Sequence, residues 1–320
     1  MTYPAFSIVI PTYQRKGAVC DAVLALAKLK YRGSFEIIVV VDGSTDGTAN
    51  ALARLQSPVQ LRVIEQANAG QAAARNRGAA EATGDIILFV DDDLICEPDI
   101  LEEHARMHRQ GADAVTGEIP LHPESKPGLV TDALAKAAAW ERKPPVSAFH
   151  VYGGHLSIRK RAFEELGGFD QSFCDGGYGG DDLDFGLRLV GRYDVRHNKA
   201  AIAWQKSDIG PRKHMRRARH LAESDLRLIA KHPEVTAELL ASRGAPCPGK
   251  PSLLFRLSRV PLLAEIAAPV AAWSAELARR TDLRSNATLA RFYFAARSLS
   301  YWSAVRKAAG TATLRQWLGL

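Results

Sequence analysis

Short runs of branched apolar residues constrain the fold of this chain more than any other feature. They are rich in Ile and Val, as in the buried strands of a parallel sheet, and each ends in turn-forming or polar residues. These runs are Phe6–Ile10, Glu36–Val41 and Asp85–Val90, and the shorter run Leu61–Ile64 predicts another strand. Helical patterns lie between them, at Ala18–Leu29, Ala49–Gln56 and Gln71–Glu81. This alternation predicts an open, doubly wound α/β sheet, in which ligands bind beyond the carboxyl ends of the strands.

The remainder of the chain has a different pattern. A helix is expected near Leu129–Trp140, followed by a glycine-punctuated stretch, Gly153–Gly180, and a charged helix near residues 182–190. From about Gly210 the chain is mostly helical, with a linker at Arg243–Pro251. We therefore expect a main domain over residues 1–235, with halves at 1–119 and 120–210, and a helical extension over 236–320.

Positive charge is concentrated toward the C-terminal end. The whole chain has 42 Lys and Arg against 35 Asp and Glu, whereas residues 205–320 have 20 against 8. Such a segment can bind nucleic acid, an anionic membrane or a phosphorylated ligand, and solvated arginines on helix faces produce the same pattern. The four cysteines are far apart and form no CxxC pair, which fits a reducing cytoplasm. We expect neither a signal segment nor a membrane-spanning helix.

The first two strands end in loops that could contact a nucleotide. The first loop begins PTYQR, at residues 11–15, and lacks the G-x-G-x-x-G of a dinucleotide-binding unit. Proline after the strand predicts a turn that exposes Thr12 and Tyr13 at the sheet edge. Asp42 ends the second strand, where a carboxylate can accept a hydrogen bond from a base or ribose. Ser44 or Asp46 can instead cap the helix that follows.

Three aspartates, Asp91, Asp92 and Asp93, follow the third long strand. Adjacent carboxylates repel one another unless they are solvated or bridged by a cation. Mg²⁺ or Mn²⁺ holding two phosphates would meet that need, and strand alternation points Asp91 and Asp93 to the same side. A solvated acidic turn is the alternative.

A fourth cluster, GGYGGDDLDFGLRL, covers residues 176–189. Its glycines allow a ligand to approach the backbone, and Asp182 opens a helix. A carboxylate at that position can act as a general base toward an attacking hydroxyl. The alternative is a helix cap stabilised by the helix dipole.

Together these motifs resemble those of the family 2 glycosyltransferases with the GT-A fold. The resemblance runs in order through IVIPTYQR, VVVDGSTDGT, NAGQAAARNRGA, ILFVDDD, GGHLSIRKRAFEELGGFD and GGYGGDDLDF, over about Phe6–Gln205. It implies an open, mixed, doubly wound sheet with helices on both faces, followed by the helical extension. It also implies metal-dependent, inverting transfer of a sugar from a nucleotide diphosphate, with UDP favoured, to an acceptor hydroxyl.

The resemblance also implies roles for individual residues. Asp182 would be the catalytic base. Asp93 and Asp91 would bind Mg²⁺ or Mn²⁺. The donor-binding positions would be Pro11, Thr12, Tyr13, Arg15, Asp42, Gly70, Arg75, Asp91 and Asp92. The acceptor-binding positions would be Gly153, Gly154, His155, Asp181 and Trp204.

The sequence departs from the family pattern at three places. Asp181 stands where the family has glutamate, and His155 stands where it often has asparagine. Trp204 and Gln205 stand where the family often has a metal-binding histidine, so Gln205 or His214 is the candidate replacement.

Two other functions agree with parts of the sequence. A nucleotidyltransferase would carry a glycine- and Lys/Arg-rich triphosphate loop, of which PTYQRKG is a poor version. A non-catalytic sugar-nucleotide binder would explain the missing histidine, but Asp91, Asp93 and Asp182 are present.

The acceptor class stays open among a carbohydrate, a lipid-linked sugar and a small molecule, and we expect no nucleic-acid partner. The basic segment Arg212–His220 could bind a donor diphosphate, an acceptor phosphate or lipid headgroups. Leu253–Leu263 and Phe292–Val305 mix Arg with large apolar residues, as in an interfacial helix, a packed helix or a homodimer contact. We expect a cytoplasmic protein that can associate with the inner face of the membrane.

Overall fold

The computed structural model describes most of the chain, in several segments. The described residues are 2–125, 128–130, 146–174, 179–206, 210–243, 256–281, 287–310, 313, 314 and 317. Most of the helix expected at Leu129–Trp140 and most of the linker expected at Arg243–Pro251 lie outside these residues.

The chain divides into two compact units. The first comprises residues 1–124, 135–175 and 181–207, and the second comprises 125–134, 176–180 and 208–320. The main division therefore falls near residue 208, whereas the sequence pattern suggested 236. The difference arises because α8 (Pro211–Lys231) buries Met215 in an apolar cluster with residues of α11 (Pro261–Arg280) and α12 (Ala287–Ala309).

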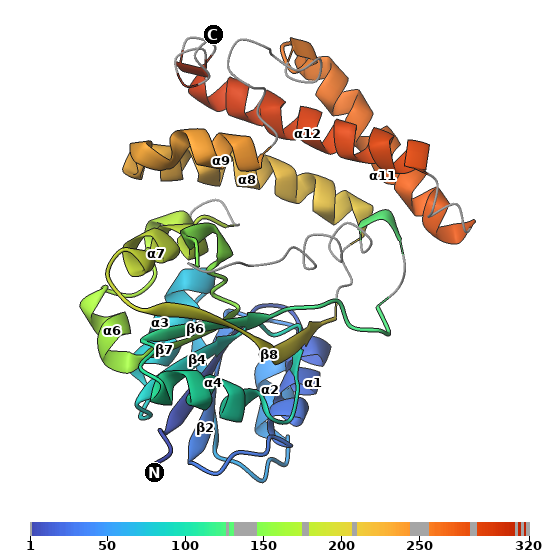
Figure 1. Cartoon of the computed structure of the whole chain (residues 1–320). Coiled ribbons are helices and arrows are strands. Elements are labelled where there is room, and N and C mark those ends of the chain that lie inside the picture. The colour runs from blue at the N-terminus through green and yellow to red at the C-terminus, as the bar shows by residue number, and fades with distance from the viewer. Residues whose placement is uncertain are drawn as a thin grey trace. The chain divides into compact units, whose positions relative to one another are not determined.

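The first unit contains a mixed eight-stranded sheet in the order β3-β2-β1-β4-β7-β6-β8-β5 (Figure 1). The strands β1 to β4 are parallel, and β7 runs antiparallel to both β4 and β6. β6 and β8 are parallel, and β5 runs antiparallel to β8. The strands are β1 Phe6–Thr12, β2 Phe35–Asp42, β3 Leu61–Gln66, β4 Ile86–Val90, β5 Leu94–Cys96, β6 Ala114–Glu118, β7 His155–Arg159 and β8 Val195–Gln205.

Helices cover both faces of this sheet. Successive residues of a strand point to opposite faces, so Ile8 and Ile10 join one apolar cluster while Val9 joins the other. The first cluster includes α1 and α4, and the second includes α3, α6 and α7. The helices of this unit are α1 Lys16–Leu26, α2 Thr48–Ala53, α3 Gln71–Ala80, α4 Ile100–Arg109, α6 Lys160–Glu165 and α7 Asp181–Val190. The predicted doubly wound α/β fold is confirmed.

The second unit is helical, as expected. In addition to α8, α11 and α12 it contains α9 (Thr236–Ser242). Its apolar cluster is dominated by small residues of α11 that pack around Tyr293 of α12. Among the described residues, no helix combines the length and the apolarity that crossing a membrane requires.

Candidate active site

The loop after β1 lies against the aspartates that follow β4. Thr12 donates a hydrogen bond to Asp92 over 2.7 Å, and Arg15 forms ion pairs with Asp92 and with Asp93, the latter at 3.1 Å. Burial raises the pKa of Asp92 to about 6, although Arg15 and Thr12 lower it in part. The positive charge of Arg15 therefore offsets part of the repulsion between the carboxylates of Asp92 and Asp93.

The expected exposure of Thr12 is wrong. β1 continues through Pro11 and Thr12, both of which are buried, and Tyr13 alone of the predicted pair is exposed, at 51%. Pairing of β1 with β4 ends at Val9, so the missing N–H of Pro11 removes no bond from that ladder. The chain leaves the strand beyond Thr12, and Gln14 then adopts a left-handed conformation with φ of 55°.

Asp42 holds the loop that precedes α3. Its carboxylate accepts hydrogen bonds from the backbone N–H groups of Ala69 (2.9 Å) and Gly70 (2.8 Å) and from the amide of Gln66 (2.8 Å). Gly70 has φ of 89° and ψ of 167°, a backbone conformation that only glycine adopts readily. Asp42 and Gly70 thus shape the loop before α3 together, and the sequence pattern did not predict Gln66 as a partner of Asp42.

Arg75 is the centre of the site. It lies on α3, its side chain is 1% exposed, and its guanidinium stacks over the ring of Phe169 at 5.2 Å. One terminal nitrogen binds Asp182 at 2.8 Å and Asp181 at 3.2 Å, and the other binds Asp91 at 2.9 Å. A buried cation thus joins carboxylates from two segments about ninety residues apart in the sequence.

Asp181 and Asp182 form the first residues of α7, where the helix dipole favours negative charge. Burial raises the pKa of both carboxyls, and Arg75 lowers it in part. The side chain of Asp182 is nevertheless 28% exposed, whereas that of Asp181 is buried. Asp182 is therefore the carboxylate of the pair that an external molecule can reach.

Gly153 and Gly154 lie against the carboxylates of Asp182 and Asp91, at positions where a larger residue does not fit. A Cβ atom on Gly153 would collide with the carboxylate of Asp182 and lie 2.8 Å from Arg75, and one on Gly154 would collide with the carboxylate of Asp91. The carbonyl of Gly154 also accepts the backbone N–H of Asp91 over 3.0 Å. The glycines allow the two acidic segments to approach each other.

Comparison with known proteins identifies the family. The sequence profile of glycosyl transferase family 2 matches residues 7–167, about half of the chain. The chain belongs to glycosyl transferase family 2. A second profile, the N-terminal domain of galactosyltransferase, matches residues 134–217.

The chain is similar in sequence to named glycosyltransferases and in fold to solved structures. Validoxylamine A glucosyltransferase from Streptomyces hygroscopicus subsp. jinggangensis is 26% identical over 269 residues, which cover 74% of this chain and 63% of that protein. The mannosyltransferase PcManGT from Pyrobaculum calidifontis, solved with GDP-Man and Mn²⁺, shares the fold with a TM-score of 0.57 and 20% identity. That match covers 94% of this chain and 88% of the other. TarS from S. aureus, solved with UDP-GlcNAc, matches with a TM-score of 0.53 and 17% identity, over 96% and 91% of the two chains.

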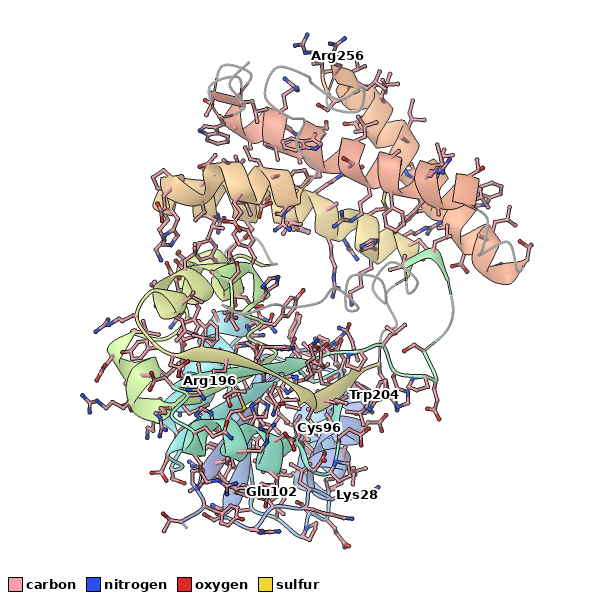
Figure 2. The ribbon with its side chains drawn as sticks, viewed as in Figure 1. Lys28, Cys96, Glu102, Arg196, Trp204 and Arg256 are labelled. Carbon is pink, nitrogen blue, oxygen red and sulfur yellow. The ribbon has the colours of Figure 1, made fainter. Side chains whose placement is uncertain are left out.

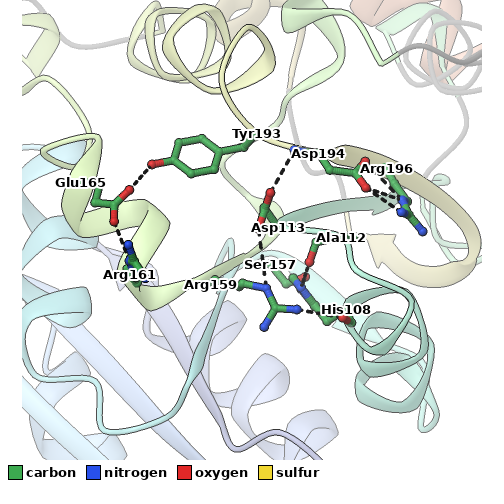
Figure 3. A network of polar contacts seen from close by, with 10 residues as sticks. All are labelled: His108, Ala112, Asp113, Ser157, Arg159, Arg161, Glu165, Tyr193, Asp194 and Arg196. Atoms are coloured by element: carbon green, nitrogen blue, oxygen red, sulfur yellow. Dashed lines mark hydrogen bonds and ion pairs between the residues drawn. The ribbon is translucent and has the colours of Figure 1, made fainter.

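His155, predicted to bind the acceptor, lies in the interior of the first unit. It is fully buried, and its Nε2 lies 3.1 Å from Nε2 of His104. Nδ1 of His104 and Nε2 of His108 both contact the hydroxyl of Ser157, at 2.8 and 2.7 Å. Figure 3 shows His108 and Ser157 with the ion pairs around them. The acceptor-binding role of His155 stays a prediction, and the sequence pattern did not indicate the histidine cluster.

Trp204 also has a partner on the far strand of the sheet. Trp204, labelled in Figure 2, lies on β8 opposite Ile95 of β5, and its indole N–H donates to the carboxylate of Glu97, the residue after β5. This contact orients the ring by the edge strand. Among the predicted acceptor residues, the structure brings Gly153, Gly154 and Asp181 to Arg75 and leaves Trp204 and His155 elsewhere.

The carboxylates that follow β4 fit a divalent cation whose remaining ligands come from the phosphates of a substrate. Among the described residues, no three His, Cys, Asp or Glu side chains gather as a ready-made metal site. Mg²⁺ is commonly held by one or two carboxylates together with substrate phosphates, and Asp91 and Asp93 offer that number. Both side chains keep some exposed surface, whereas the neighbouring Asp92 is largely buried.

Gln205 and His214 are the two candidates for the place of the family's metal-binding histidine. Lys206 donates its backbone N–H to the carbonyl of Asp93 over 2.9 Å, which brings the end of β8 beside the aspartates. His214 lies in the second unit, where its Nδ1 contacts the hydroxyl of Tyr293 at 2.7 Å.

Proposed function

We propose that this chain is an inverting, metal-dependent glycosyltransferase that moves a sugar from a nucleotide diphosphate to an acceptor hydroxyl. The arrangement at Arg75 carries the proposal. One buried guanidinium binds Asp91, from the donor-side triplet, and both Asp181 and Asp182, from the acceptor-side helix. The two halves of a transfer site are thereby held within a few ångströms of one another.

Asp182 acts as the general base. It takes the proton of the acceptor hydroxyl as that oxygen attacks the anomeric carbon, in a single displacement that inverts the configuration. Its raised pKa gives the carboxylate more basicity than an exposed aspartate has, while Arg75 favours the ionised form. Asp181, deeper and largely buried, helps to fix the position of Arg75.

The donor binds on the opposite side of Asp91. Exposed Tyr13 is available to stack on the base, and the loop that Asp42 holds at Ala69 and Gly70 borders the sugar nucleotide. Asp91 and Asp93 would hold Mg²⁺ or Mn²⁺, which when bound offsets the charge on the departing diphosphate. Arg15 restrains Asp92 and Asp93 in the absence of that charge.

UDP is the carrier we favour, and the acceptor is a carbohydrate, a lipid-linked sugar or a small molecule. A relative with the fold, TarS, was solved with UDP-GlcNAc, whereas PcManGT was solved with GDP-Man. The name of the validoxylamine A glucosyltransferase points to a small-molecule acceptor for that relative. This chain spans less than two thirds of that relative's length, so the acceptor is best determined on the protein itself.

The proposal is tested by the melting temperature with a panel of nucleotide diphosphate sugars, each with and without Mn²⁺. A ligand that binds the folded state raises the melting temperature by mass action. We expect one nucleotide diphosphate sugar to raise the melting temperature, and to do so only when Mn²⁺ is present. Asp93→Asn should abolish that rise, and the control Asp21→Asn, a half-exposed aspartate on α1 paired with Lys206, should retain it. Donor affinity that is indifferent to a chelator would contradict the metal assignment.

Product analysis separates the two alternative functions. A glycosyltransferase releases the nucleotide diphosphate when donor and acceptor are mixed. A nucleotidyltransferase would instead consume a nucleoside triphosphate and release pyrophosphate. A non-catalytic binder would show the Mn²⁺-dependent rise in melting temperature without release of either product.

A further inference from the structure

Helix α11 has its small residues inside and its large apolar residues outside. The buried side chains of this helix include Ala264, Ala268, Ala271, Ala272, Ala275 and Ala278. The exposed ones include Leu262, Leu263, Ile266, Val270, Trp273 and Leu277. Exposed apolar residues recur every three or four positions from 262 to 277, so they form one stripe along the helix. We call these six exposed side chains the α11 stripe.

A helix that only packs within its own unit in water is expected to bury its large apolar residues and expose its alanines, the opposite of what α11 does. Burying a large apolar side chain is worth far more than burying an alanine methyl, so a helix whose single role is to pack within its unit buries its leucines. Here Trp273 is 63% exposed and Leu262 is 60% exposed. Contiguous exposed apolar surface of this kind marks a surface that contacts something other than water.

Basic side chains lie at both ends of the stripe. Arg256 and Arg259 are exposed just before α11, and Arg256 extends outward in Figure 2. Arg280 is exposed at the end of the helix, and Arg291 is exposed near the start of α12. Among the described residues of α11, Glu265 is the single exposed acid. Arginines at both ends of an apolar stripe can reach anionic headgroups while the stripe contacts the acyl chains.

We propose that the α11 stripe binds the surface of an anionic membrane. The helix lies in the plane of the headgroups, with Ile266, Val270 and Trp273 directed toward the acyl chains and the flanking arginines on lipid phosphates. The alanine face remains packed on the helices of its own unit.

A second copy of the chain fits this stripe less well. Pairing two α11 helices in parallel places Arg280 beside Arg280, and pairing them antiparallel places it near Arg256 and Arg259, so like charges meet in either orientation. Pro269 is also exposed in the middle of the helix, where proline removes a backbone hydrogen bond and favours a bend of the helix axis. A straight helix pair would have to accommodate that bend.

The test is flotation of the full chain with lipid vesicles. We expect binding to phosphatidylcholine vesicles that contain phosphatidylglycerol and weaker binding to phosphatidylcholine alone. Ile266→Glu and Trp273→Ala should each reduce the bound fraction several-fold. Arg256→Gln with Arg259→Gln should weaken binding to the anionic vesicles by about fivefold per arginine, since each basic residue near such a surface contributes about 1 kcal/mol.

The matched control is Leu24→Glu, which adds the same charge at an exposed leucine of α1 in the first unit and should leave vesicle binding unchanged. Full binding by Ile266→Glu, or no binding by the unmodified chain, would overturn the proposal. So would a dimer in solution, measured by light scattering, that Ile266→Glu converts to a monomer while neither form binds vesicles. Circular dichroism of each variant confirms that the helical content is retained.

Discussion

Replacing Arg75 by glutamine tests whether one buried cation holds the carboxylates of the site together. In the folded chain its guanidinium lies within 3.2 Å of Asp91, Asp181 and Asp182, and all four side chains are less than one-third exposed. Removing one partner of a buried ion pair leaves uncompensated charge and costs about 3–5 kcal/mol. We expect Arg75→Gln to lose about this much of the free energy of unfolding at about pH 8.

The loss should depend on pH in a defined direction. Without the guanidinium, burial and mutual repulsion raise the pKa of Asp181 and Asp182 in the folded variant further above their values in the unfolded chain. A raised carboxyl pKa destabilises the folded state above that pKa, and the penalty disappears as the pH falls and the folded state binds protons. The difference between the unmodified chain and Arg75→Gln should therefore shrink from about pH 8 to about pH 5.

Urea unfolding at both pH values measures the effect. The control is Arg77→Gln, two residues along α3, whose half-exposed side chain pairs with Glu81 at 3.1 Å and should contribute less than about 0.5 kcal/mol. If Arg75→Gln unfolds too readily to measure, adding Asp181→Asn should restore part of the stability by removing one repelling charge. Equal losses at the two pH values, or equal losses for Arg75→Gln and Arg77→Gln, would refute the reasoning.

Three further predictions follow from the same site and its surroundings. Asp182→Asn should keep donor binding but lower the release of nucleotide diphosphate by about 10²–10⁴-fold, because it removes the general base. The difference in the free energy of unfolding between the unmodified chain and His108→Gln should fall as the pH drops from about 6.5 to about 4, because burial lowers the pKa of His108 and the unfolded chain therefore binds that proton first. Gly154→Ala should lower turnover, whereas Gly17→Ala, whose added methyl meets nothing within 4 Å, should not.

Each of these has an outcome that contradicts it. Near-normal rates for Asp182→Asn would exclude that residue as the base. A difference between the unmodified chain and His108→Gln that grows on acidification through the stated window would mean that His108 is charged in the folded chain. Full activity of Gly154→Ala would show that the carboxylate of Asp91 can move away without loss of function.

The parallel half of the sheet could be predicted from the sequence because its strands are buried on both faces. A strand such as β4 therefore has an unbroken apolar sequence, and β1, β2 and β3 were found within two residues of the expected positions. The sequence pattern alone predicted none of the strands β5, β6, β7 and β8. β5 has three residues, and β8 has the mixed sequence VRHNKAAIAWQ, so neither shows a clear period.

The sequence predicted which residue types belong to the site, but it did not predict how those residues are arranged in space. The aspartates after β4 and at the start of α7 stand out because carboxylates directly beside apolar segments need an explanation. Their arrangement does not follow from their positions. The carboxylate of Asp42, expected to contact a nucleotide, accepts hydrogen bonds from the backbone N–H groups of Ala69 and Gly70. The ring of His155 is buried beside the ring of His104.

The sequence by itself determined the class of fold, the family and the acidic residues of the candidate site, because each depends on short motifs whose physical meaning is local. Tertiary structure alone decided that Arg75 binds both Asp91 and the pair Asp181 and Asp182, which follows Asp91 by about ninety residues in the sequence. It also decided that α11 buries its alanines and exposes its leucines. Both outcomes depend on which elements pack together, and the order of the strands and helices in space sets that packing.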